Sequence, residues 1–257
     1  MPLTVLYLIL FFLAGIILGS FYNVCIYRIP RDQSVAFPAS HCTSCGHALS
    51  SADLVPVFSW IFLRGICRYC KSKISVRYPL VESLTGMIFA GIYLVSGITM
   101  TTAFNLVFAS LMIIITFIDI DFRIIPDRFI ITGTILAVVK FFVVKDLNWT
   151  EVVIGGVIGG GVLLLVDLAG RIFYKKEGMG LGDVKLMLMA GAYLGYANTI
   201  VALLGAIWIG AIAGIIILRS NRTREDNYMA FGPFLALGSL IALFGGKQII
   251  QFYLSLF

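Results

Sequence analysis

The chain has 257 residues, of which 60% are hydrophobic and only 12% are charged, and its mean hydropathy is +1.01. This composition excludes an ordinary soluble domain and predicts an all-α polytopic membrane protein. The formal net charge of +6 would suit a nucleic-acid partner, but the basic residues are distributed as membrane topology requires, so no nucleic-acid partner is expected.

Apolar segments recur along the chain at about the 20 residues that an α-helix needs to cross the hydrocarbon layer. The first of them lacks the basic start and the small-residue cleavage site of a signal peptide, so a retained first helix is expected over residues 1–21. About eight transmembrane helices are predicted, near residues 3–21, 80–98, 101–119, 128–145, 151–173, 183–198, 199–218 and 231–254.

Residues 22–80 form the one long polar stretch and predict a small cytosolic insert that resembles a zinc ribbon. Four thiolates in two Cys-x-x-Cys pairs can fill the tetrahedral shell of a structural zinc ion. A disulfide or redox pair is the alternative, which a reducing cytosol disfavours. His41 and His47 are interpreted as solvated neighbours of the site. The predicted zinc ligands, with 21 residues between the two pairs, are Cys42, Cys45, Cys67 and Cys70.

Several residues within the apolar segments have structural explanations. Glu82 stands near the start of a helix, where the N-terminus stabilises a carboxylate by about 0.3–1 kcal/mol. Asp167 can pair with Arg171 one turn later and is interpreted as structural. Asn23 favours a hydrogen bond between helices. Glycines four residues apart predict close helix packing, at Gly155 with Gly159, Gly156 with Gly160, and Gly210 with Gly214.

An Asp-x-Asp pair ends the third apolar segment, and Pro126 follows it. On a helix, Asp119 and Asp121 point about 200° apart, so only one of them can face a partner across the bundle. An ionisable residue at the edge of a hydrocarbon layer is costly and therefore indicates a functional site.

A second acidic motif, Gly178-Met-Gly180-Leu-Gly182-Asp183-Val-Lys185, begins the sixth segment. Two carboxylates close together on facing helix ends hold one proton between them and can act as acid and base. The simpler alternative is that Asp119 and Asp183 cap helices or pair with Arg123 and Lys185.

The distribution of positive charge predicts the orientation of these motifs. Of the 19 Lys and Arg residues, only Lys140, Lys145 and Lys247 fall outside the loops that follow the odd-numbered spans. The positive-inside rule then places those loops in the cytosol, together with the insert and both aspartates, and residues 146–150 outside.

These motifs together resemble the bacterial type IV prepilin leader peptidases, a branch of the GxGD intramembrane aspartyl proteases. The resemblance rests on Gly19-Ser-Phe-Tyr-Asn23, the two Cys-x-x-Cys pairs, Arg77-Tyr-Pro-Leu-Val-Glu82, both aspartate motifs and Phe231-Gly-Pro-Phe-Leu-Ala236. It implies a bifunctional enzyme of the bacterial inner membrane that cleaves the leader of type IV prepilins or pseudopilins and N-methylates the new terminus with S-adenosylmethionine.

The resemblance also implies roles for individual residues. It selects Asp119, rather than Asp121, as the catalytic partner of Asp183, because Asp119 stands seven residues before Pro126. It implies a domain division into the first helix at 1–21, the insert at 22–80, linked to methyl transfer, and the protease bundle at 81–257. Glu82 becomes a candidate for the methyl-transfer region, and the supporting loop comprises Gly180, Gly182 and Lys185.

Other classes of function account for fewer of these features. A GxGD protease without methyltransferase activity remains open, although one of the presenilin type would not explain the insert. A proton-coupled transporter would require acids near the bilayer midplane and inverted repeats, and the sequence has neither. A zinc-bearing membrane scaffold would not explain two aspartates at one face.

Overall fold

The structure is a computed structural model that describes residues 2–174, 179–219 and 229–256. The chain divides into two compact units, Met1–Thr102 and Ala103–Phe257. Among the described residues the regular elements are helical, and the only β-type pairing is in two isolated bridges within the insert. The prediction of an all-α membrane protein is therefore confirmed.

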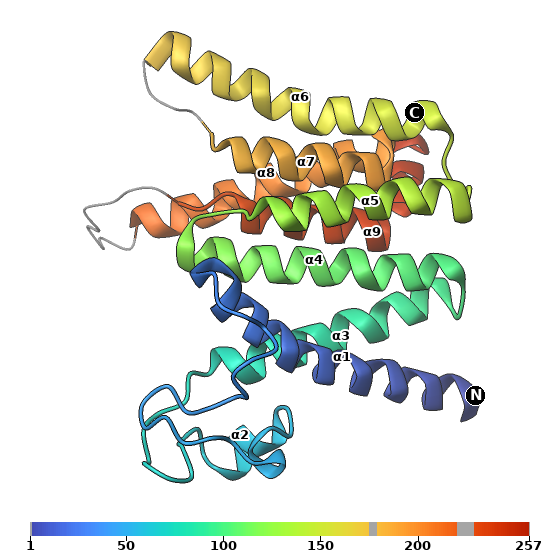
Figure 1. Cartoon of the computed structure of the whole chain (residues 1–257). Helices are drawn as coiled ribbons and strands as arrows, with labels where there is room; N and C mark the ends of the chain where they lie inside the picture. Colours follow the sequence, from blue (N-terminus) through green and yellow to red (C-terminus); the bar gives the residue numbers. More distant parts are fainter. Residues whose placement is uncertain (1, 175–178, 220–228, 257) are drawn as a thin grey trace. The chain divides into compact units, whose positions relative to one another are not determined.

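The first unit is a pair of long helices with the polar insert between them (Figure 1). α1 (Pro2–Arg28) continues beyond the expected end at residue 21 and packs along α3 (Arg77–Ser96). A Cβ at Gly15 would lie 2.7 Å from the Cα of Gly86, so the two backbones cross almost in contact. The predicted interhelical bond of Asn23 is present, from its amide to the carbonyl of Tyr78 at 3.2 Å. The insert contains η1 (Ile29–Arg31), η2 (Ser51–Asp53) and α2 (Phe58–Phe62).

The second unit is a bundle built around one short helix (Figure 1). α7 (Leu181–Leu194) contacts α5, α6, α8 and α9. Its Leu186, Met187 and Met189 side chains are fully buried. The surrounding helices are α4 (Met100–Phe122), α5 (Asp127–Val143), α6 (Trp149–Tyr174), α8 (Tyr196–Arg219) and α9 (Gly232–Leu254).

The expected count of eight transmembrane helices is not confirmed. Within the described ranges, six helices are long and apolar enough to cross a bilayer, namely α1, α3, α4, α6, α8 and α9. α7 has 14 residues, about 21 Å at 1.5 Å per residue, which is shorter than a hydrocarbon core of about 30 Å. It ends at Leu194, because the next residue, Gly195, has a φ of 79° that does not continue a helix. α5 has 17 residues and starts only after Pro126.

The glycines of α6 bring its backbone into contact with that of α7. A Cβ on Gly155 would overlap the carbonyl oxygen of Gly191, and one on Gly159 would overlap that of Met187. The predicted glycine faces of α6 are therefore confirmed as packing features, whereas the atoms nearest to a Cβ at Gly210 and Gly214 of α8 are side-chain atoms, of Phe231 and Met229. In the absence of a hydrophobic driving force between helices in lipid, such close approach supplies the van der Waals contact that holds them together.

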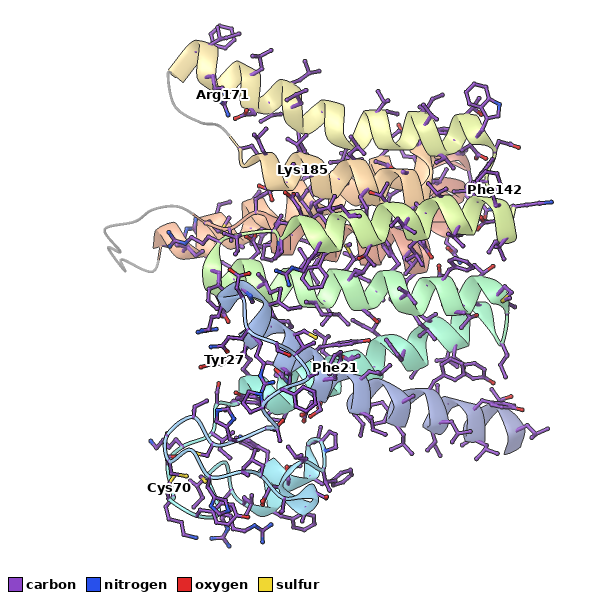
Figure 2. All side chains as sticks on the ribbon, viewed as in Figure 1. Phe21, Tyr27, Cys70, Phe142, Arg171 and Lys185 are labelled. Atoms are coloured by element: carbon purple, nitrogen blue, oxygen red, sulfur yellow. The ribbon has the colours of Figure 1, made fainter. Side chains whose placement is uncertain are left out.

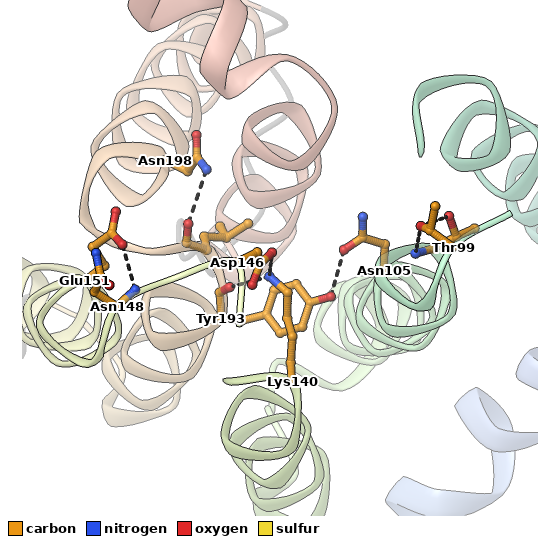
Figure 3. Close-up of polar contacts among 10 residues, drawn as sticks. Thr99, Asn105, Lys140, Asp146, Asn148, Glu151, Tyr193 and Asn198 are labelled. Atoms are coloured by element: carbon orange, nitrogen blue, oxygen red, sulfur yellow. Dashed lines mark hydrogen bonds and ion pairs between the residues drawn. The ribbon is translucent and has the colours of Figure 1, made fainter. Parts of the chain in front are cut away.

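A buried polar network joins α4, α5 and α7 near the carboxyl end of α7 (Figure 3). The Tyr193 hydroxyl donates to Asn105 at 2.8 Å, and its ring stacks on Phe108 with centroids 4.1 Å apart. Lys140 lies 4.4 Å from the centre of the Tyr193 ring, donates to the Tyr193 carbonyl at 3.4 Å and pairs with Asp146 at 3.0 Å. A cation at a helix C-terminus is favourable, so Lys140 stabilises the point at which α7 stops.

Replacing Gly159 by alanine should destabilise the bundle, because the added methyl group overlaps the Met187 carbonyl. We expect a loss of about 1–3 kcal/mol in the free energy of unfolding, typical of overpacking. Gly161→Ala, on the same helix but facing open space, is the matched control and should lose nothing. Unfolding of the purified protein in detergent measures both, and equal effects would contradict the packing role.

Candidate functional site

The four cysteines of the insert converge as the zinc prediction requires. Their sulfur atoms all lie within 4.8 Å of one another, and those of Cys42 and Cys70 are 3.9 Å apart. A tetrahedral ion with bonds of about 2.3 Å separates its sulfur ligands by about 3.8 Å, so the donor set fits Zn²⁺. The ligand group is Cys42, Cys45, Cys67 and Cys70.

The two cysteine pairs have the same local fold. In each, the residue before the first cysteine bridges the residue six positions after that cysteine: His41 to Ala48, and Ile66 to Lys73. Backbone N–H groups of Cys45 and Ser44 lower the pKa of the Cys42 thiol, which favours the thiolate that metals bind, whereas desolvation and the neighbouring thiols raise the pKa of Cys45. His47 lies against Tyr69, with ring centroids 3.7 Å apart, and is not part of the sulfur cluster.

Glu82 connects α3 to the insert. Its carboxylate is buried and accepts a hydrogen bond from the backbone N–H of Val57 at 2.7 Å. Val57 has a φ of 64° and immediately precedes α2, so the contact holds a strained turn in place. The structure thus places Glu82 at the base of the insert, as a support for its backbone.

Asp119 stands close to the carboxyl end of α4. Its side chain is buried, whereas Asp121 is exposed, as the helical geometry predicts for residues two apart. The backbone N–H of Gly232, at the start of α9, faces the Asp119 carboxylate. Asp119 is therefore the acid that faces the bundle interior.

Asp183 lies in the first turn of α7. Gly180 is the residue before the helix, and its carbonyl accepts the N–H of Asp183 at 3.0 Å. The N–H of Gly180 in turn faces the Asp183 carboxylate. Gly182 allows this turn to approach the segment after α4, since its Cβ would lie 3.2 Å from that of Ile125.

A single groove of about 330 Å³ contains both acids. α4 ends and α7 begins at the same end of the second unit, and Figure 2 shows Lys185 at that end and Phe142 at the other. Asp119 lies close enough to Asp183 to interact with it electrostatically. The groove is lined by Asp119, Arg123, Ile124, Ile125, Asp127, Gly180, Gly182, Asp183 and Lys185.

Lys185 forms an ion pair with Asp127, which the alternative of ion pairs at Asp119 and Asp183 did not include. Its ammonium group lies 2.7 Å from Asp127 at the start of α5, and both side chains are largely exposed. Such a pair contributes at most about 1 kcal/mol, but it links α7 to α5 at the edge of the groove. Gly178 of the second acidic motif, and the basic residues at 175, 176, 222 and 224 that were counted among the cytosolic loops, lie outside the described residues.

Gly232 is a site residue that the sequence analysis did not identify individually. A Cβ there would lie 2.5 Å from Oδ2 of Asp119, so only glycine lets the start of α9 meet that carboxylate. The available signal was the Gly232-Pro233 break, which marked a helix start on the same face as both aspartates.

The fold and site define a helical membrane protein with paired aspartates at one end of a bundle and a four-cysteine insert. The Bacterial Peptidase A24 N-terminal domain matches residues 13–96, and the Type IV leader peptidase family matches residues 106–215. No solved structure matches the chain.

Curated relatives cover nearly the whole chain. The prepilin leader peptidase/N-methyltransferase of Aeromonas hydrophila is 32% identical over 98% of this chain and 95% of its own length. That of Bacillus subtilis is 34% identical over 95% and 97%, and that of Pseudomonas aeruginosa is 29% identical over 94% and 91%. The chain belongs to the prepilin leader peptidase/N-methyltransferase family.

Gly232→Ala should displace the Asp119 carboxylate and lower peptide cleavage by about tenfold or more, because misplacement by about 1 Å can cost a hundredfold. Gly245→Ala in the same helix meets only Ile249, at 3.9 Å, and is the control. Initial rates of cleavage of a synthetic leader peptide, compared at equal amounts of folded protein, provide the measurement. Normal cleavage by the Gly232 variant would show that the close approach is unimportant.

Proposed function

We propose that the chain cleaves the leader peptide of prepilins or pseudopilins with Asp119 and Asp183 and then methylates the new amino terminus. The observation that carries the proteolytic half is that two carboxylates 64 residues apart in sequence, on α4 and α7, line one groove. A protease of this class needs both a carboxylate base and a carboxylic acid, and water must reach them.

Cleavage would proceed by sharing one proton. Two neighbouring carboxylates in a partly buried site do not both ionise easily, so one is a base while the other is an acid. The base takes a proton from a water molecule while the water oxygen attacks the scissile carbonyl carbon. The acid gives its proton to the carbonyl oxygen. When the amine leaves, the aspartate that took the proton from water gives it to the leaving nitrogen. The other aspartate takes a proton back from the tetrahedral intermediate. Gly232 and Gly180 direct their N–H groups at the two carboxylates and help to orient them.

The orientation of the groove would fit the substrate. In a bacterial inner membrane with the basic loops inside, the groove faces the cytosol, where the basic leader of the substrate lies. The apolar helix that follows the cleavage site would remain in the lipid bilayer. Asp119 and Asp183 at helix ends, rather than at mid-helix, support this arrangement over a proton relay through a transporter.

Methyl transfer is assigned to the first unit. S-adenosylmethionine would supply an electrophilic methyl group to the new terminal amine. One cavity of that unit has about 160 Å³ and is lined by Asn23, Tyr27, Ser75, Arg77 and Tyr78. That is below the 300–1,000 Å³ or so of small-molecule sites, so it does not enclose the whole donor and no donor-binding residue is assigned. Glu82 lies one turn from Tyr78 and supports this region.

Asp119→Asn and Asp183→Asn should each reduce cleavage to below about 1% of wild type, because loss of a general acid or base costs about 10²–10⁴ in rate. Asp121→Asn, at an exposed position on the same helix, is the control and should remain active. The assay mixes purified protein with a leader-pilin peptide, with and without S-adenosylmethionine, and reads product masses. An inactive Asp121 variant beside an active Asp119 variant would reverse the choice.

A Cys67→Ser, Cys70→Ser double variant should lose bound zinc and methylation while retaining most cleavage. Four thiolates leave no open coordination position, so zinc would fold the insert without taking part in the chemistry. Metal content by mass spectrometry and both activities measure the effect, with Cys25→Ser as the control because Cys25 lies outside the cluster. Loss of cleavage with methylation intact would refute this assignment.

A further inference from the structure

Asp167 is a buried carboxylate in α6 that accepts hydrogen bonds from two different parts of the described chain. Only 4% of its side chain is exposed, against 45% for Arg171. Oδ2 accepts a hydrogen bond from Nε of Arg171 at 2.8 Å, one turn along the same helix. Oδ1 accepts a second hydrogen bond, from the backbone N–H of Met179 at 3.1 Å. The sequence analysis anticipated the first partner and not the second.

The bond to Met179 reaches the turn that begins α7. Met179 immediately precedes Gly180, whose N–H faces the Asp183 carboxylate. Successive amides are therefore directed at two carboxylates, that of Met179 at Asp167 of α6 and that of Gly180 at Asp183 of α7. This fastens the turn carrying Asp183 to the neighbouring helix.

An ion pair with Arg171 alone does not account for this arrangement. A pair of that kind on a helix surface needs no buried carboxylate, and burial of a carboxylate is costly unless several donors satisfy it. Asp167 is also absent from the described lining of the groove that contains Asp119 and Asp183. It therefore does not touch the reacting groups, and its second bond points to the backbone of the turn.

We propose that Asp167 is a positioning residue, which holds the Met179 amide so that the turn at Gly180 presents Asp183 to Asp119. This inference rests on the proposed function of Asp183. The glycines of α6 fix the body of α7, whereas the entry turn lies beyond them and requires its own anchor. Without that anchor the backbone at Met179 is no longer fixed, so the Gly180 amide that follows it can shift relative to Asp183. Catalytic groups must be held to within about 0.5 Å.

Two electrically neutral double variants isolate the bond to Met179. In D167N/R171Q the asparagine carbonyl can still accept the Met179 N–H, and its amide can donate to the glutamine. In D167L/R171Q a side chain of similar size has no acceptor. Both variants lack the ion pair between residues 167 and 171. A difference in kcat or amide exchange between them therefore measures the effect of the hydrogen bond from the Met179 N–H.

The two variants should differ in kcat and in amide exchange. We expect D167N/R171Q to keep kcat within about threefold of wild type, and D167L/R171Q to lose about tenfold or more with KM within about twofold. Hydrogen exchange of the segment 179–183, followed by mass spectrometry, should be faster in the leucine variant only. Equal kcat values in the two variants, or equal exchange, would overturn the inference.

Two controls separate this inference from its premises. Asp183→Asn in the same assay tests the proposed function, since an active variant would refute the role of Asp183 while leaving the exchange result valid. Should the leucine variant fail to fold, Asp167→Glu replaces it, because the longer side chain moves the carboxylate away from the position that accepts the Met179 N–H. It should lower kcat and speed exchange at an unchanged melting temperature, and wild-type values for both would overturn the inference.

Discussion

The second unit depends on the close contact between α6 and the short buried helix α7. Gly155 and Gly159 remove the side chains that would otherwise keep the two backbones apart. α7 can therefore be enclosed by four neighbouring helices, although it is too short to cross a bilayer by itself. This packing sets the position and rotation of α7 in the bundle. It thereby also sets the position of Asp183, which lies in the first turn of α7.

The surroundings of the two acids suit proton transfer. Both lie at helix ends, where backbone N–H groups are available to face them, and both line a groove that water can enter. A carboxylate in the middle of an apolar helix would lack both features. Asp167 extends the same principle, since it engages an amide of the turn just ahead of α7.

The first unit has its own means of stability. Two knuckles with matching hydrogen bonds bring four sulfur atoms to the spacing of a tetrahedral ion, and an insert with so small a core gains from such a cross-link. Asp53 adds a polar link, accepting from Ser50 beyond the first knuckle and from Arg68 and Tyr69 in the second. Glu82 fixes the insert to α3 through the Val57 amide.

The choice of Asp119 within the Asp-x-Asp pair came from the family resemblance. The sequence by itself determined the helical membrane class, the four-cysteine cluster and the fact that only one acid of that pair can face inward. Each follows from a local rule, whether hydropathy, ligand spacing or the 100° turn of a helix. Only the tertiary structure decided that α7 is too short to span, that Gly232 meets Asp119 and that Asp167 binds Met179. The last two contacts join different elements through a missing Cβ or a backbone amide. Every residue except proline carries a backbone N–H, and many glycines serve other purposes, so residue types alone could not reveal which of them meet.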